Sequence, residues 1–235
     1  MDKEELQKIL IKHASWLTQE NGGERINLTG ADLHNADLRG ANLKKANLIK
    51  ANLQNADLRS AILSETNLQN ANLTGANLSG ADLVLANLVS ANLTGAILTG
   101  AALNNAHLTH AILKDADLRG ENLLGAWLEG ANLSGADLRG AILESAHLEK
   151  VAFLGGAILI GANLRGINLN SANLRDVVLE GADLTGANLM RADLKGANLG
   201  GANLTGANLM EANLKGANLV GANLKGVISI GAKGI

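Results

Sequence analysis

Ala197-Asn198-Leu199-Gly200-Gly201 is one copy of a five-residue unit that recurs through nearly the whole chain, from Ile26 to Val227. The unit consists of a small apolar residue, Asn or Asp, then Leu, then two variable residues of which the second is often Gly. Self-similarity at a fixed period is typical of solenoid proteins, and it has to be recognised before any helix or strand is assigned. The repeat therefore decides the fold.

The register of the central Leu shifts once along the chain. It recurs every five residues as far as Leu148 and again from Leu159 onward, but the two runs are offset by one residue. We place the extra residue near 154–156, which makes Phe153 the one central residue that is not Leu. Because protein interiors are closely packed, a ring at a Leu position predicts a wider interior there.

A period of five fits neither an uninterrupted helix nor an uninterrupted strand. Five residues advance about 500° around an α-helix, so successive Leu side chains would drift by about 140° and form no stripe. Strand side chains alternate between two faces, and an odd period would turn every second Leu outward. The conflict disappears if the backbone turns a corner once per unit, with the small residue and the Leu pointing inward. Four such corners close a square coil of about 20 residues, and stacked coils pair as parallel ladders.

With these residues the chain resembles the pentapeptide repeat proteins, in the Leu-centred A(N/D)LxG form of many cyanobacterial members. The resemblance covers about residues 25–230. It implies an all-β solenoid: a right-handed quadrilateral parallel β-helix of about ten coils, roughly 48 Å long at the usual strand spacing. We therefore expect an N-terminal α-helical cap over residues 1–24 and the β-helix over residues 25–235.

Residues 2–21 have the pattern of an amphipathic helix, and Gly22-Gly23 provides a stop. The apolar face has i, i+3 and i+4 spacing and consists of Leu6, Ile9, Leu10, His13 and Leu17. An open ladder edge invites pairing with other chains, and solenoids therefore cover their ends. We interpret the segment as a cap that packs on the first coil; an alternative is a helix that binds a partner.

The other end has no equivalent helix. After Leu224 the chain is apolar, with Val227, Ile228 and Ile230 as its large side chains. An uncovered last coil predicts end-to-end association, and we expect a homodimer through the C-terminal coils. Pentapeptide repeat proteins of the quinolone-resistance type dimerise at that end, so the resemblance implies the same arrangement.

Composition excludes several classes of site. The 235 residues contain no Cys, which excludes disulfides and thiolate metal sites. A formal net charge of −2 argues against a general affinity for nucleic acid. No apolar run approaches the 18 or so residues of a membrane-spanning helix, so we expect no membrane partner. The acidic start of the chain shows no secretory signal, which predicts a cytoplasmic location.

Positions 20 apart stack on one face, and two columns stand out. One carries Asp-Leu-Arg triplets at 37–39, 57–59, 117–119 and 137–139. We interpret it as a solvated ladder of ion pairs, with recognition of a charged partner as the alternative. A second column replaces Asn by His107, Trp127 and His147. The two His lie two coils apart with a Trp between them, too far for one metal ion, so we predict local packing or a partner contact.

A third face collects apolar residues at outward or corner positions of neighbouring coils. They are Ile62, Val84, Leu85, Ala102, Leu124 and Ile142. A contiguous exposed apolar cluster marks an interface more often than single exposed apolar residues do. We predict that another protein or subunit docks here.

Glu121 occupies an inward position whose column otherwise holds Ala. A lone buried carboxylate is costly and would have a raised pKa. We expect the side chain to escape through a local bulge.

A convex rod offers neither a pocket nor convergent titratable groups, so the sequence predicts a protein that is not an enzyme and holds no cofactor. We expect a structural or protein-interaction scaffold that presents flat faces to an unidentified protein partner. The alternative is DNA mimicry, by which some family members act on DNA gyrase. Mimicry needs a strongly acidic rod, whereas this chain mixes Asp with Arg and Lys.

Overall fold

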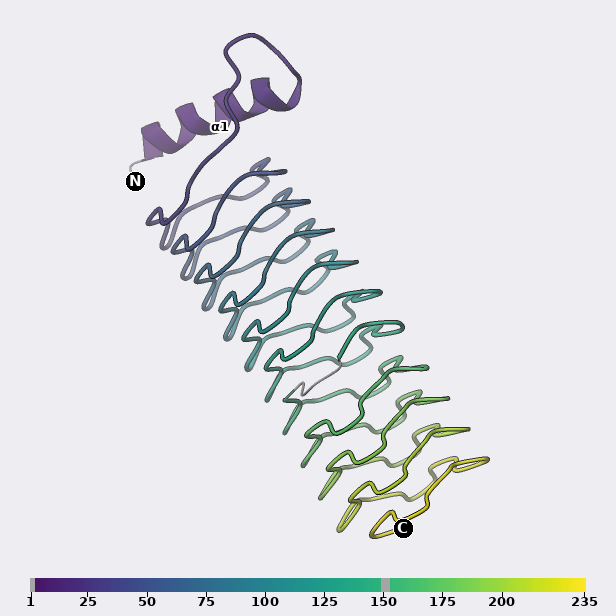
Figure 1. Cartoon of the computed structure of the whole chain (residues 1–235). Coiled ribbons are helices and arrows are strands. Elements are labelled where there is room, and N and C mark those ends of the chain that lie inside the picture. The colour runs from purple at the N-terminus through teal and green to yellow at the C-terminus, as the bar shows by residue number, and fades with distance from the viewer. Residues whose placement is uncertain (1–2, 149–152) are drawn as a thin grey trace.

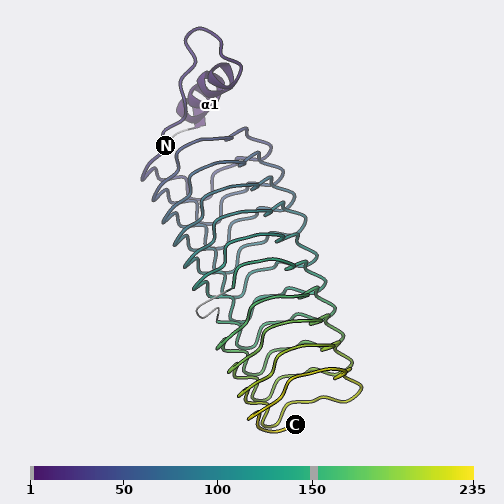
Figure 2. The same cartoon turned by 45° about the vertical axis from the view of Figure 1, so that its right-hand side comes forward.

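The computed structural model describes residues 3–148 and 153–235. It contains one α-helix, α1 (Lys3–Leu17), followed by a four-sided coil that winds along a single axis to the C-terminus. Figure 1 shows α1 lying across the first coil, and Figure 2 shows the same stacking from a second direction. The helix is shorter than the expected 2–21.

The sides of the coil are extended only briefly. Along the described coils the residue that precedes a central Leu forms a parallel bridge with its counterpart in the neighbouring coil, as Asn27 does with Asn47 and Asn47 with Asn67. The Leu N–H continues this ladder, for example from Leu78 to the carbonyl of Ile97 at 2.7 Å. The corner is closed within the unit, where Ala81 donates to the carbonyl of Leu78 at 2.9 Å. The ladders therefore run along the rod and connect each coil to the next.

The interior consists almost entirely of Ala and Leu. Ala76 and Leu78 are fully buried, and the same two positions of nearly every coil are buried as well. This confirms that the small residue and the Leu point inward, and it explains why aromatic residues make up only 1% of the chain. A tube filled by the smallest and one mid-sized apolar side chain has no room for rings.

The register near the extra residue differs from our expectation. Phe153 is 45% exposed and bridges Asn132 and Asn173, so it holds the outward position before the Leu. Leu154 is the inward residue, at 2% exposure. The extra residue therefore precedes Phe153 and does not lie near 154–156; the segment between Leu148 and Phe153 includes residues outside the described part of the chain. The assignment of Phe153 to the core was wrong because a ring buried there would displace its neighbours, whereas Leu154 fits the tube.

His13 joins α1 to the β-helix. It is fully buried; its Nδ1 accepts the Ile26 N–H at 3.1 Å, and its Nε2 lies 3.0 Å from the Lys44 carbonyl. These bonds require a neutral ring with the proton on Nε2, because a protonated Nδ1 could not accept. Burial, assisted by the charge of Arg25, lowers the pKa of His13 against the opposing effect of the Lys44 carbonyl. Trp16 stacks on the ring at 5.5 Å.

Acidification is expected to loosen the cap. Because the pKa of His13 is lower in the folded protein than in the unfolded chain, its contribution to stability is present above about pH 6.5 and is lost as the pH falls through the folded value. Opening of the cap should then rise about tenfold per pH unit. The emission of Trp16, measured in a Trp127→Phe background, reports it. In His13→Gln, which has no titrating ring, the same acid transition should be absent; an unchanged transition would contradict the prediction.

The last coil lacks a cover among the described residues. Leu209 and Leu214 are fully buried, whereas Leu219 and Leu224 are half-buried. Of the residues that we assigned to a dimer end, Val227 faces the interior, while Ile228 bridges Asn208 and lies, with Ile230, on a side face. The end-to-end homodimer stays a prediction, and the surface that would carry it is formed by Leu219 and Leu224.

No helix in the described part of the chain has the length and apolar character needed to cross a bilayer.

Candidate functional site

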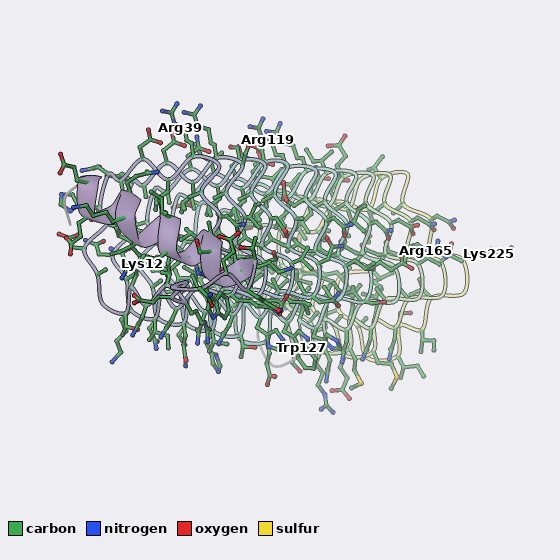
Figure 3. The ribbon with its side chains drawn as sticks, turned by 90° about the horizontal axis from the view of Figure 1, so that it is seen from above. Lys12, Arg39, Arg119, Trp127, Arg165 and Lys225 are labelled. Carbon is green, nitrogen blue, oxygen red and sulfur yellow. The ribbon has the colours of Figure 1, made fainter. Side chains whose placement is uncertain are left out.

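The coil presents distinct side faces with different chemistry. In Figure 3 Arg39 and Arg119 project from one side, Trp127 from the opposite side, and Arg165 and Lys225 from a third. The bridges confirm that each face is a set of columns in which residues one coil apart lie side by side. Position in the five-residue unit thus decides on which face a side chain lies.

The apolar residues that we predicted to form an interface do share one face. The structure stacks Ile62, Asp82, Ala102, Asn122 and Ile142 in a single column of bridges. Beside it runs a column with Val84 and Leu124, and Leu85 stands at the adjoining corner. We call the set Ile62, Val84, Leu85, Ala102, Leu124 and Ile142 the apolar strip. Ile62, Leu85, Leu124 and Ile142 are exposed, from 38% for Ile62 to 52% for Leu85, whereas Val84 and Ala102 are half-buried. The strip is therefore open to a partner.

Leu85 is held in an unfavourable conformation. It occupies a corner with φ of 59°, in the left-handed region, where the Cβ of most residues is crowded. The other residues at such corners in the described chain are Gly or polar residues. A Leu there is strained by about 1 kcal/mol and is also exposed to water. Neither property stabilises the isolated rod, whereas a contact with another surface would use the exposed side chain.

His107, Trp127 and His147 form a stack of rings. The ring centroids of His107 and Trp127 lie 5.8 Å apart and those of Trp127 and His147 4.4 Å apart, with nearly parallel planes. Since the rings cover one another's faces, they present mainly their edges to solvent. Among the described residues no group of three His, Cys, Asp or Glu side chains could hold a metal ion. The stack is a packed column, and a partner contact at its edges stays a prediction.

The Asp-Arg ladder consists of pairs closed within each triplet. Arg59 donates from Nε and an Nη to both carboxylate oxygens of Asp57, at 2.8 and 2.6 Å, and the other three triplets repeat this geometry. The hydrogen bonds from their own Arg lower the pKa values of Asp57, Asp117 and Asp137. Each carboxylate is therefore neutralised locally, and this face does not offer the continuous acidic surface that a DNA mimic requires.

Open clefts flank helix α1, and the repeat pattern does not predict them. One of them, of about 520 Å³, is lined by Trp16, Leu17, Gln19, Asn42, Lys44 and Lys45. Both Lys Nζ atoms lie within 4 Å of the Glu65 carboxylate, Lys44 at 3.8 Å and Lys45 at 3.4 Å. One carboxylate therefore compensates part of the positive charge of the two Lys side chains.

Glu121 does not escape to solvent, contrary to our expectation of a bulge. It is 1% exposed, and neither carboxylate oxygen has a hydrogen-bond partner. Burial raises the pKa of Glu121 to about 7, against the opposing attraction of the Gly100 and Ala101 N–H groups. Thr66, the other polar residue at such a position, instead donates to the Leu43 carbonyl at 2.6 Å.

Backbone hydrogen bonds between neighbouring coils are missing where Glu121 is buried. In the stretch 98–123 three ladder hydrogen bonds fail to form: Gly100 to Arg119, Asn122 to Ala101, and Leu103 to Asn122. The parallel bridge of Ala102 and Asn122 persists. The coils therefore stay stacked while the ladder loosens locally, because a carboxyl group is larger than the methyl group of the Ala that fills this column elsewhere.

Comparison with known proteins agrees with this architecture. The family model described as pentapeptide repeats matches in eight copies, over residues 26–64, 51–88, 86–123, 122–153, 154–186 and 187–226. These segments span most of the chain. The chain belongs to the pentapeptide repeat family.

Several solved pentapeptide repeat structures are similar to this member of the family. HetL from the cyanobacterium Nostoc sp. strain PCC 7120, described as involved in heterocyst differentiation regulation, is 33% identical, with 95% of this chain and 94% of HetL covered and a TM-score of 0.55. QnrB1, a plasmid-mediated fluoroquinolone resistance protein, is 22% identical, with 89% and 86% covered and a TM-score of 0.37. Rfr23 from the cyanobacterium Cyanothece 51142 is 36% identical, with 48% and 64% covered and a TM-score of 0.19. No curated protein matches the sequence.

Membership of the family establishes the fold of the chain but not its specific function. Pentapeptide repeat proteins are right-handed quadrilateral β-helices and in general act as structural or interaction proteins. Two chains built on the same unit share residues for architectural reasons, so identity in the repeat supports a common shape. What distinguishes this chain from other members lies in the positions that depart from the repeat, and the apolar strip is one set of these.

Proposed function

We propose that this pentapeptide repeat protein is a non-enzymatic scaffold that binds a protein through the apolar strip. The observation that carries the proposal is Leu85, a large apolar side chain that is both exposed and held at positive φ. The neighbouring exposed residues of the strip extend this contact surface along the rod. Protein interfaces combine apolar contacts with hydrogen-bonding groups, and the strip places exposed apolar side chains beside Asn and Asp.

The rigidity of the rod suits it to this role. The parallel bridges keep the column from Ile62 to Ile142 in register even where three ladder hydrogen bonds are missing beneath its middle, so the strip residues need little ordering on binding. Similarity to HetL, which takes part in regulating differentiation, supports a role in binding, because regulation can be exerted by contact alone.

Charge placed on the strip is expected to abolish partner capture. Ile62→Lys together with Leu124→Lys places two ammonium groups on a surface that must lose its water when a partner binds. We expect the amount of captured protein to fall at least about tenfold. Proteins retained from a cell extract, including untagged copies of the chain itself, are compared between the variant and the parent.

The matched control changes the opposite face. Ile112 is 40% exposed, close to the 38% of Ile62, and occupies the same place in its unit. Ile112→Lys with Gln54→Lys adds the same charge and should leave capture unchanged. If both double variants retain the same proteins as the parent, the strip is not the binding surface.

A further inference from the structure

The apolar strip is arranged symmetrically about its own middle. In the column of bridges, Ile62 and Ile142 lie two coils to either side of Ala102. In the next column, Val84 and Leu124 lie one coil to either side of Asn104. Two backbone hydrogen bonds show this: the Leu85 N–H donates to the Asn104 carbonyl, and the Asn105 N–H donates to the Leu124 carbonyl. Large apolar residues thus occur in pairs, with small or polar ones at the centre.

This symmetry is the one that a two-fold interface requires. When two identical rods pack face to face about an axis that crosses them at right angles, they run antiparallel and each residue meets a residue of its own column. With the axis at Ala102 and Asn104, Ile62 meets Ile142 of the second copy, and Val84 meets Leu124. Each apolar side chain then faces another.

The corner residues also fit. Leu85 lies one coil from the axis on one side, and Gly125 occupies the equivalent corner on the other. In the antiparallel pair the projecting Leu85 side chain therefore faces a corner without a side chain. The strained Leu85 acquires a contact, and both copies gain it equally.

Among the charges that flank the strip one like pair meets, Lys44 with Arg165 of the second copy, and each of these two cations has a carboxylate of its own chain within 4 Å. Glu65 comes opposite Ser145 of the second copy, and Glu144 opposite Ser64, so no two carboxylates face each other within the strip. One coil further out, Lys44 faces Arg165 of the second copy. Each of these cations also has a carboxylate of the other copy diagonally beside it: Glu144 of the second copy beside Lys44, and Glu65 beside Arg165 of the second copy. Positive and negative charges therefore alternate at each end of the strip.

We propose that the apolar strip binds a second copy of this chain, antiparallel, about a two-fold axis at Ala102 and Asn104. The inference rests on the proposed function, since it takes the strip as the binding surface and names its occupant. It differs from an end-to-end homodimer, in which the contact is made by the last coils. In that arrangement the strip of each copy, with Ile62, would stay uncovered.

Cross-linking tests the arrangement, because the chain has no Cys and a single introduced thiol reports its own position. Facing sheets pack about 10 Å apart, so a bifunctional maleimide of about that span is used with Ile62→Cys and Ile142→Cys. Each variant alone should remain uncross-linked, whereas an equimolar mixture should yield a covalent dimer. Light scattering of the parent should give twice the 24.2 kDa of one chain.

Two controls make the result specific. Ile112→Cys, mixed with Ile142→Cys, should give no dimer, because Ile112 lies on the opposite face. Ala102→Arg places two guanidinium groups together at the axis and should reduce the cross-linked yield to that of the Ile112→Cys mixture, while circular dichroism confirms an intact fold.

Other outcomes would overturn the inference in distinguishable ways. Cross-linking of Ile62→Cys with itself would show a different arrangement. A monomeric parent that yields no cross-linked mixture, yet captures another protein through the strip, would refute the second copy and leave the proposed function standing. The mixture of Cys variants could cross-link while other proteins are still captured by variants with a charged strip. That result would support the two-fold pair and would show that the strip does not bind those other proteins. No strip-dependent contact of either kind would refute both.

Discussion

Glu121→Ala is expected to raise the free energy of unfolding by about 3 kcal/mol at pH 8. The pKa of Glu121 is raised from 4.5 to about 7 in the folded protein, chiefly by burial. Below pH 4.5 the carboxyl group is protonated in the folded and unfolded states alike and carries no ionisation cost. As the pH rises toward 7 the unfolded chain ionises first, so stability falls; above 7 the loss is complete. Ala fills this column elsewhere and should also let the ladder bonds at Gly100, Leu103 and Asn122 re-form.

The pH profile of the difference separates ionisation from packing. Urea unfolding followed by circular dichroism is measured from pH 4 to pH 8 for the parent, Glu121→Ala and Glu121→Gln. Both variants should lose the decline between pH 4.5 and 7, while only Ala should gain stability at low pH as well, because the amide of Gln remains unpaired. Since the same residues titrate elsewhere in all three proteins, their contributions cancel in the difference. A difference independent of pH would mean that the carboxylate reaches water.

Leu154→Ala is expected to lower the free energy of unfolding by about 2–5 kcal/mol, as truncation of a buried Leu generally does. Leu154 is 2% exposed and fills the interior immediately after the register shift. Phe153→Ala should cost about 1 kcal/mol or less, because the ring is 45% exposed and lies outside the tube. Chemical denaturation of the two variants, measured side by side, gives the comparison. The reverse order of effects would restore the register in which Phe153 is the core residue.

That pair of variants marks the point where the sequence was ambiguous. Phe153 and Leu154 are both apolar, and either can continue the five-residue count with one extra residue on the appropriate side. Placing the insertion near 154–156 kept Phe153 in the Leu register. The tertiary structure chooses Leu154, because the neighbouring coils leave space for a Leu and their outward columns accept a ring between Asn132 and Asn173.

Other features followed from spacing alone. The apolar strip, the ring stack of His107, Trp127 and His147, and the Asp-Arg ladder were assembled by counting in steps of 20, and the bridges place them as counted. Counting succeeds because all these residues precede the extra residue, in coils of equal length, so positions 20 apart stay in register. Counting does not show whether a face is complementary to the same face of a second rod, because that depends on how neighbouring columns lie relative to each other.

The amino-acid sequence by itself determined the quadrilateral coil, since only a chain that bends every five residues can bring each Leu to one axis. It likewise determined which residues share a face. The tertiary structure decided which of two apolar residues enters the core at the register shift, that Glu121 remains inside at the expense of its ladder, and that His13 fixes the cap through two backbone groups. Those outcomes depend on how much space and how many hydrogen-bond partners the neighbouring coils leave, and no local pattern contains that information.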